Sequence, residues 1–256
     1  MQPFFFGPSK SQLYGVFHDS YGQHSEKRGL ILCHPLGGEY MRSHRAFQVL
    51  AQKAGENGFP CLRFDYRDTG NSSGDGSFQY GKLREDIHDA ICELKDLADV
   101  SSVTLIGLRL GASLAYEVAC SRDDVKELVL WDPILYGHHY LWAMAQKMAK
   151  AGLLTSSECA DEVYFNGYPY SNKFRSDLAK MDLFSYSAPE LEKCTLISTD
   201  GCQLEKFKQH LESFAPCHLI KFNLCFDWLK LDDGGNLIMP SKVLQSIGDS
   251  LLRKVH

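Results

Sequence analysis

The chain has 256 residues, of which 44% are hydrophobic and 23% are charged. This length and apolar content suffice for one buried core, so we expect a single domain over residues 1–256. The formal net charge of -5 supplies no basic field for nucleic acid or anionic lipid. We therefore expect a small molecule or another protein as the partner, and no nucleic acid.

The cysteine pattern and the N-terminus bear on the compartment. Nine cysteines are scattered without a Cys-x-x-Cys pair or the histidine spacing of a zinc site. We interpret them as reduced thiols of a cytoplasmic protein, and we expect no metal and no cofactor. The start, MQPFFFGPSK, lacks the basic and apolar regions of a signal peptide. No run reaches the roughly 18 apolar residues of a spanning helix, so we expect no membrane span.

In chain order, short apolar runs alternate with longer helical patterns. An opening hairpin is expected from PFFFG and QLYGVF, followed by strands in GLILCH, CLRFDY, VTLIG, KELVLWD, CTLIST and HLIKFN. Helices are expected over about residues 42–57, 79–98, 110–121, 204–214 and 241–253. This alternation predicts an α/β fold with a mostly parallel central sheet and helices on both faces.

Residues 133–189 interrupt the alternation. They contain an amphipathic stretch, YGHHYLWAMAQKMAKAGLL, and a tyrosine-rich stretch with turn residues, DEVYFNGYPYSNKF. We expect this insertion to form a lid over one edge of the sheet. The Trp, Met and Tyr side chains of YLWAMAQKM are expected to pack on the body of the domain and, within a lid, to line an apolar pocket suited to an acyl chain.

The segment LIGLRLGASLAY, residues 105–116, has the outline of a nucleophile elbow. A strand ends in a Gly-x-x-x-Gly turn and a helix of small residues follows. The middle position, where a hydrolase presents serine, is Arg109. A guanidinium has a pKa above about 12 and no available lone pair at neutral pH, so it can neither attack a carbonyl nor act as a general base.

Four segments together resemble the α/β-hydrolase fold: LCHPLGGEYMRSHRAF, LRFDYRDTGNSSGD, LIGLRLGASLAYEVA and LVLWDPILYG. More closely, they are similar to exosortase-A-system-associated hydrolases of the second type and to serine-aminopeptidase-like hydrolases of biosynthetic gene clusters. In the former group an arginine likewise stands in a Gly-Leu-Arg-Leu-Gly turn. The resemblance covers about residues 30–137 and implies an acyl ester, thioester or amide hydrolase lineage, with the later elements placed by analogy of fold.

The resemblance also implies a catalytic triad, whose parts are largely missing here. An elbow serine would attack, a histidine after the last strand would take its proton, and an acid would orient that histidine. The segment after the last expected strand, NLCFDWLKLDDGGN, contains no histidine. The acid could be Asp200, after CTLIST, or Asp132, at the end of KELVLWD. An oxyanion hole is implied at the amide of Leu110 and at HPLGGE, which contributes His34, Gly37 and Gly38.

Two roles remain open for Arg109. The elbow faces the pocket at a helix N-terminus, which favours an anion, and a guanidinium there could hold a ligand carboxylate or phosphate. Arg42 and Arg45 could add charge at the same rim. Alternatively, Arg109 is a structural plug paired with Glu39, Asp132 or Asp200, because an unpaired buried charge is very costly.

These alternatives give two hypotheses of function. In the first, the pocket binds an acidic or acyl-bearing small molecule and acts, if at all, without a covalent serine intermediate. In the second, the protein is a non-catalytic pseudo-hydrolase that serves as a partner or scaffold in a biosynthetic pathway.

Other candidate nucleophiles and sites are weaker. A cysteine hydrolase using Cys33 with His34, or Cys202, is conceivable, but a thiol in an apolar run is more often simply buried. Ser113, one turn after the elbow, is expected to pack or cap locally. His138 and His139 face different ways on a helix, which disfavours a metal site. The stretch DTGNSSGDG lacks the Gly-Lys-Ser/Thr ending of a phosphate loop and predicts a surface turn.

Overall fold

The computed structural model describes residues 1–21, 27–74, 76, 78–152, 155–156, 161–165, 167–187, 189–199, 204–224, 226–230 and 237–252. Its main sheet has eight strands in the order β1-β2-β4-β3-β5-β6-β10-β11. The strands are β1 (Gln2–Phe6), β2 (Leu13–His18), β3 (Arg28–Cys33), β4 (Cys61–Phe64), β5 (Ser102–Leu108), β6 (Val125–Trp131), β10 (Lys193–Ser198) and β11 (Cys217–Lys221). β2 runs antiparallel to both β1 and β4, and the other neighbours are parallel.

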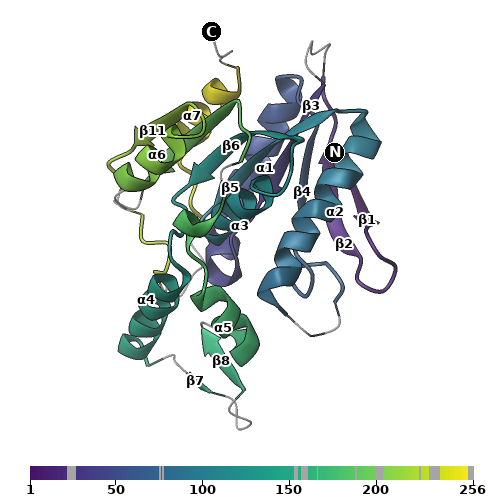
Figure 1. The fold of residues 1–256 in the computed structure, drawn as a ribbon. Helices are drawn as coiled ribbons and strands as arrows, with labels where there is room; N and C mark the ends of the chain where they lie inside the picture. Colours follow the sequence, from purple (N-terminus) through teal and green to yellow (C-terminus); the bar gives the residue numbers. More distant parts are fainter. Residues whose placement is uncertain are drawn as a thin grey trace.

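Helices cover both faces of this sheet (Figure 1). On one face, α1 (Gly37–Glu56) and α7 (Ser241–Leu252) form a core around Phe47, Leu50 and Ile247. The other face carries α2 (Tyr80–Ala98), α3 (Leu110–Ala119) and α6 (Glu205–Glu212). The predicted mostly parallel sheet with helices on both faces is confirmed. The central strands carry apolar side chains on both faces, so each face of the sheet must be covered by helices.

Between β6 and β10 the chain leaves the sheet and forms a separate group of elements, which we call the α4–η1 segment. It contains α4 (Gly137–Lys150), a three-stranded antiparallel sheet of β7 (Thr155–Ser156), β8 (Glu162–Phe165) and β9 (Tyr168–Ser171), then α5 (Asn172–Ala179) and η1 (Leu183–Ser185). It extends from the end of the sheet at which β6 finishes (Figure 1).

The inward face of α4 follows from its sequence. Tyr140, Met144 and Met148 recur every four residues and are buried, as one stripe of a helix should be. Trp142 departs from the expectation that the aromatic side chains of this stretch pack on the body, because it is 66% exposed. It lies on the opposite face of the helix, two residues from the buried stripe.

The five helices predicted around the sheet are present in the predicted order, whereas α5 was not predicted and α1 starts earlier than expected. This helix begins at Gly37 rather than near Arg42. Glycine is a poor helix former, which hid the first turn in the sequence. Glu39 stabilises that turn through the favourable interaction of an acidic side chain with a helix N-terminus. Within the described residues, none of the helices is both long and apolar enough to cross a membrane.

Candidate functional site

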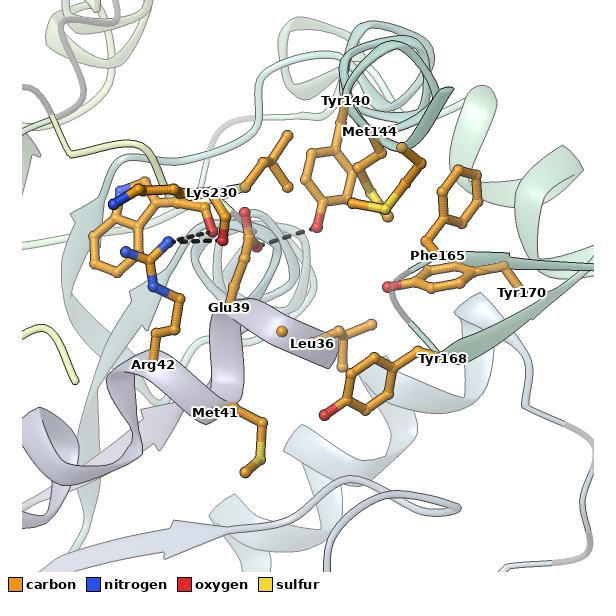
Figure 2. Close-up of a pocket in the computed structure, with 14 residues that line it drawn as sticks. Leu36, Glu39, Met41, Arg42, Tyr140, Met144, Phe165, Tyr168, Tyr170 and Lys230 are labelled. Atoms are coloured by element: carbon orange, nitrogen blue, oxygen red, sulfur yellow. Dashed lines mark hydrogen bonds between the residues drawn. The ribbon is translucent and has the colours of Figure 1, made fainter. Parts of the chain in front are cut away.

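A cavity of about 200 Å³ lies between the first turns of α1, the inward face of α4, strands β8 and β9, and residues 228–230 (Figure 2). Most of its wall is methionine and aromatic, including Met41, Met144, Met148, Phe165, Tyr168 and Tyr170. The charged side chains in the wall are those of Glu39, Arg42 and Lys230. The cavity therefore offers an apolar body with charge concentrated on the α1 side.

Beside the cavity, β5 turns sharply into α3 at Arg109. This residue has φ 54° and ψ -123°, a conformation that costs a non-glycine residue about 1–3 kcal/mol. Close packing requires the two flanking glycines. A Cβ on Gly107 would lie 2.4 Å from the Cα of Ala112, and one on Gly111 would lie 2.3 Å from the carbonyl oxygen of His34. The strained elbow geometry is thus present although its central side chain is arginine.

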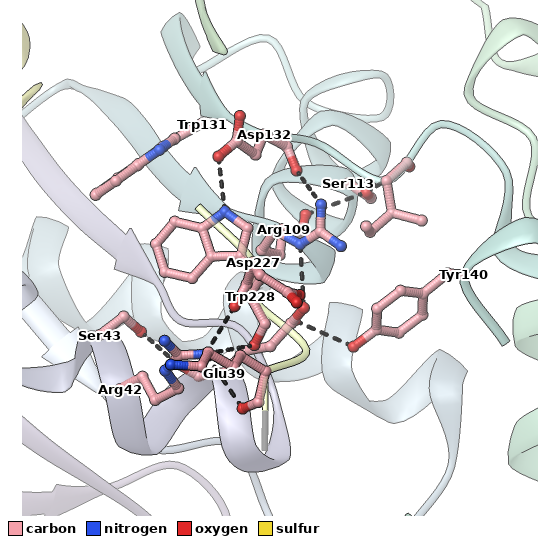
Figure 3. A network of polar contacts seen from close by, with 12 residues as sticks. Glu39, Arg42, Ser43, Arg109, Ser113, Trp131, Asp132, Tyr140, Asp227 and Trp228 are labelled. Atoms are coloured by element: carbon pink, nitrogen blue, oxygen red, sulfur yellow. Dashed lines mark hydrogen bonds and ion pairs between the residues drawn. The ribbon is translucent and has the colours of Figure 1, made fainter. Parts of the chain in front are cut away.

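Arg109 is buried, with 9% of its surface exposed, and contacts an internal carboxylate (Figure 3). Its Nε donates to Oε1 of Glu39 at 3.1 Å, and its Nη1 donates to the backbone oxygen of Asp132 at 3.5 Å. The hydroxyl of Tyr140, on α4, donates to the other oxygen of Glu39 at 3.1 Å, and the guanidinium lies 5.8 Å from the Tyr140 ring centre. The described residues of the cavity wall include Glu39 but not Arg109.

Asp132, one of the two candidate acids, is completely buried at the end of β6. Its Oδ1 accepts from the amide of Thr199 at 2.6 Å. Its Oδ2 accepts from the Thr199 hydroxyl. The same oxygen accepts at 2.7 Å from the indole Nε1 of Trp228 (Figure 3). Asp200, the other candidate, lies outside the described residues.

Trp228 belongs to the segment after the last strand of the sheet, in which the resemblance implies a histidine. Its N–H reaches the carboxylate of Asp132 as an orienting imidazole N–H would. An indole is only a donor, so it can neither take up nor return a proton. The arrangement therefore binds an acid to a ring N–H that cannot serve as a base.

The predicted oxyanion-hole residues lie around the start of α1 and α3. Gly38 belongs to the cavity wall, and Leu110 is the buried first residue of α3. Gly37 has φ 56° and lies close to the Tyr168 and Tyr170 side chains. The structure thus brings Gly37 and Gly38 to the cavity.

His34 is buried between the rings of Tyr40 and Phe47, whose centres lie 5.0 and 4.4 Å away. Burial lowers the pKa of His34 to about 3, while burial raises the pKa of the neighbouring Cys33 thiol above its ordinary value. The first is a very weak base and the second stays protonated at neutral pH. These environments argue against a Cys33–His34 nucleophile pair, and Cys202 lies outside the described residues.

The two arginines expected at the rim differ. Arg42 is in the cavity wall, and its Nη1 donates to the backbone oxygen of Asp227 at 2.7 Å, which ties α1 to the loop that carries Trp228. Arg45 corrects the expectation, because it is exposed on α1 and donates to Oε1 of Gln48 at 2.6 Å. Arg45 is not among the described residues of the cavity wall.

Two further expectations concern Ser113 and the paired histidines. The hydroxyl of Ser113 is buried and donates to the backbone oxygen of Ile134 at 2.7 Å, which is a local packing role. His138 and His139 are exposed at the start of α4. Among the described residues, no group of three or more His, Cys, Asp or Glu side chains could hold a metal ion.

Sequence reasoning missed the contribution of Trp228 and Tyr170. The resemblance implies a histidine in the segment that contains Trp228. An indole N–H can make the same donor hydrogen bond as an imidazole N–H. Tyr168 and Tyr170 are two residues apart on β9, a spacing that places both side chains on one face of a strand. That alternation, within the tyrosine-rich stretch, was a usable signal for a tyrosine-lined wall.

No protein-family model and no curated protein matches the chain. Solved structures do. Est1E from Butyrivibrio proteoclasticus, in a structure with ferulic acid bound, superposes with a TM-score of 0.70 at 15% identity over 97% of this chain and 98% of that one. A serine hydrolase described as lacking a lid, from Xanthomonas campestris, gives 0.61 at 15% identity over 100% and 96%. Mouse alpha/beta hydrolase domain-containing protein 10 gives 0.59 at 16% identity over 98% of both chains.

The chain has the α/β-hydrolase fold. At these identities the likeness concerns the architecture, and activity must be argued from the site itself. Within this fold, Arg109 occupies the sharp turn between β5 and α3.

Proposed function

We propose that this α/β-hydrolase-fold protein binds a small acyl-bearing or acidic molecule in the cavity beneath α4 and does not hydrolyse it through a serine intermediate. One observation carries the proposal: the elbow residue Arg109 is ion-paired with Glu39, while a cavity remains open beside that pair. The nucleophile position is thereby occupied by a structural contact, and the space for a ligand is kept.

Loss of hydrolysis is supported at two unlinked positions. Arg109 cannot attack a carbonyl, and Trp228, bonded to Asp132, cannot relay a proton. An oxyanion hole alone supplies only a small part of the rate enhancement of such enzymes. These substitutions favour binding over turnover.

Binding is supported by the size and lining of the cavity. An apolar cavity of about 150 Å³ is enough to hold benzene, so about 200 Å³ accommodates one ring or a short acyl chain. Methionine and aromatic side chains suit both. Arg42 and Lys230 supply positive charge at one end, which favours an anionic group there. The ferulic acid bound to Est1E combines a ring and a carboxyl group, which makes it a reasonable probe.

The α4–η1 segment acts in this proposal as a lid within a single domain. Its contacts with the body include Tyr140 with Glu39 and an ion pair between Lys147 and Asp227. Kinship with exosortase-associated or aminopeptidase-like hydrolases and a cytoplasmic location remain part of the proposal, supported by the four sequence motifs and by the cysteine pattern.

The test is calorimetric titration of ferulic acid, hexanoate and methyl hexanoate into the wild type and two variants of α4. Met144→Trp fills the cavity from its wall, whereas Gln146→Trp adds the same ring on the exposed face. We expect at least one probe to bind the wild type and Gln146→Trp alike and to lose at least about tenfold in affinity with Met144→Trp. Absence of binding by every probe would contradict the proposal, as would equal binding by both variants.

The second candidate, a non-catalytic partner or scaffold in a biosynthetic pathway, is favoured by the same Arg109–Glu39 pair, because a plugged elbow needs no substrate. The two candidate functions make different predictions about ligand binding in the cavity. If the small-molecule probes fail and an assembly with another protein forms unchanged by Met144→Trp, the scaffold hypothesis gains the support that the first one loses.

A further inference from the structure

The hydroxyl of Tyr170 stands out among the polar groups of the cavity. Tyr170 is only 3% exposed, and it belongs to the cavity wall. Over the part of the chain that the structure describes, its hydroxyl has no hydrogen-bond partner. Figure 2 shows this hydroxyl directed toward the middle of the cavity, on the side where Tyr140 and Glu39 meet. This hydroxyl is open to the cavity and bonds to no described protein group, so the site is suited to a ligand that supplies an acceptor.

Tyr170 acts as a donor. Burial, together with the nearby Glu39 carboxylate and the Tyr168 hydroxyl, raises the pKa of Tyr170 above its ordinary value. The phenol therefore keeps its proton at neutral pH and can donate it to an acceptor.

The surrounding groups offer little for a ligand to donate to. The two oxygens of Glu39 already accept from Arg109 and Tyr140. The side chains of Arg42 and Lys230 at the other end carry only donors. The wall thus presents more donors than acceptors, which favours a ligand with hydrogen-bond acceptors.

The negative charge of Glu39 near Tyr170 restricts the kind of acceptor group that fits there. A ligand carboxylate beside this hydroxyl would face the Glu39 carboxylate in a poorly hydrated space, where like charges repel strongly. The uncharged oxygen of a carbonyl avoids that repulsion and still accepts from the phenol. The geometry thus separates the acyl-bearing from the acidic alternative at this end of the cavity.

We infer that the ligand is a neutral carbonyl compound, such as an ester or tertiary amide with one ring or a short acyl chain, whose carbonyl oxygen accepts a hydrogen bond from the Tyr170 hydroxyl. This inference rests on the proposed function, because it names the class of molecule that the same cavity binds. Tyr170 is thereby a specificity-determining residue, and the methionine and aromatic wall holds the apolar part.

The test uses three probes of similar shape, titrated calorimetrically at pH 7. Methyl benzoate has a neutral carbonyl, benzoate has a carboxylate, and benzyl methyl ether has no carbonyl. We expect the wild type to bind methyl benzoate at least about tenfold more tightly than either other probe, the factor for one hydrogen bond worth about 1.4 kcal/mol. Preference for benzoate or for the ether would overturn the inference.

The variant Tyr170→Phe removes only the hydroxyl. Its matched control is Tyr164→Phe, because Tyr164 lies on the neighbouring strand β8, bonds to Glu162 and is not among the cavity-lining residues that the structure describes. Tyr170→Phe should lose about tenfold on methyl benzoate and little on the ether, while Tyr164→Phe matches the wild type. Unchanged ester binding by Tyr170→Phe would contradict this inference alone. Failure of all three probes would contradict the proposed function as well.

Discussion

The elbow centre and the cavity wall lie side by side but are built in opposite ways. In the elbow centre, which consists of Glu39, Arg109, Asp132 and Trp228, the charged groups are held by other side chains of the protein. In the wall, by contrast, the hydroxyl of Tyr170 faces the cavity and has no partner among the described residues. This difference is the basis of the proposed function, in which the elbow centre is structural and the cavity beside it binds the ligand.

The largest effect is expected from breaking the ion pair of the elbow centre. Arg109→Ala leaves the Glu39 carboxylate buried without this cation, because the two side chains are only 10% and 3% exposed. The free energy of unfolding should fall by roughly 3–5 kcal/mol, measured by urea denaturation. Arg45→Ala, which removes an exposed arginine from α1, serves as the control and should change it by less than about 0.5 kcal/mol.

A double substitution sharpens this test. Replacing both partners, as in Glu39→Leu with Arg109→Met, removes the uncompensated charge and should cost less than Arg109→Ala alone. If Arg109→Ala is as stable as the wild type, the arginine is not a structural plug. The elbow centre would then not be stabilised by its internal ion pair.

The next effect concerns the bond between Trp228 and Asp132. Trp228→Phe removes the indole N–H that reaches a completely buried carboxylate, so unfolding should become easier by about 2 kcal/mol. Trp142→Phe is the matched control, since that side chain is exposed on α4. Equal unfolding midpoints for the two variants would show that Trp228 does not hold the acid.

A pH effect tests the buried surroundings of His34. The folded protein holds the pKa of His34 at about 3, against an ordinary value of 6.5 in the unfolded chain. Between these pH values only the unfolded chain takes up the proton. The free energy of unfolding is therefore unaffected by His34 above pH 6.5 and falls by about 1.4 kcal/mol per pH unit as the pH drops toward 3. Unfolding between pH 6 and 5 should therefore be less pH-dependent in His34→Gln than in the wild type. An unchanged slope would mean that His34 is not buried in its neutral form.

The smallest effect is expected where the two regions meet. Tyr140→Phe deletes the hydroxyl that joins α4 to Glu39 and should cost about 1 kcal/mol. Amide hydrogen exchange in α4 should rise in this variant and stay unchanged in Tyr164→Phe. If both variants exchange as the wild type does, the α4–η1 segment is not held to the body through Tyr140.

The architecture was largely predictable because it depends on local pattern. Alternating apolar runs placed the strands, and the glycines at 107 and 111 indicated the elbow, where the close approach of α3 to the loop after β3 requires them. The start of α1 was the exception, since the glycines that open it are also typical of loops.

The candidate site was less predictable, because its contacts join distant parts of the chain. The partner of Arg109 was left among three carboxylates. The packing of α1 against the elbow brings Glu39 to it, while Asp200 lies outside the described residues. The bond from Trp228 to Asp132 joins residues 96 positions apart, which no local spacing indicates. Arg45 was placed at the rim by its distance in sequence, whereas the turn of α1 directs it to solvent.

The most direct test of the central claim is ester turnover by a protein with a proven ligand. Methyl benzoate and methyl hexanoate would be incubated at saturating concentration with the wild type and with Arg109→Ala, purified identically, and product acid would be quantified. The account predicts that both proteins leave the ester intact although the wild type binds it. Turnover by the wild type that falls at least about tenfold in Arg109→Ala, a loss of about 1.4 kcal/mol of transition-state stabilisation, would contradict it and place Arg109 in the chemistry.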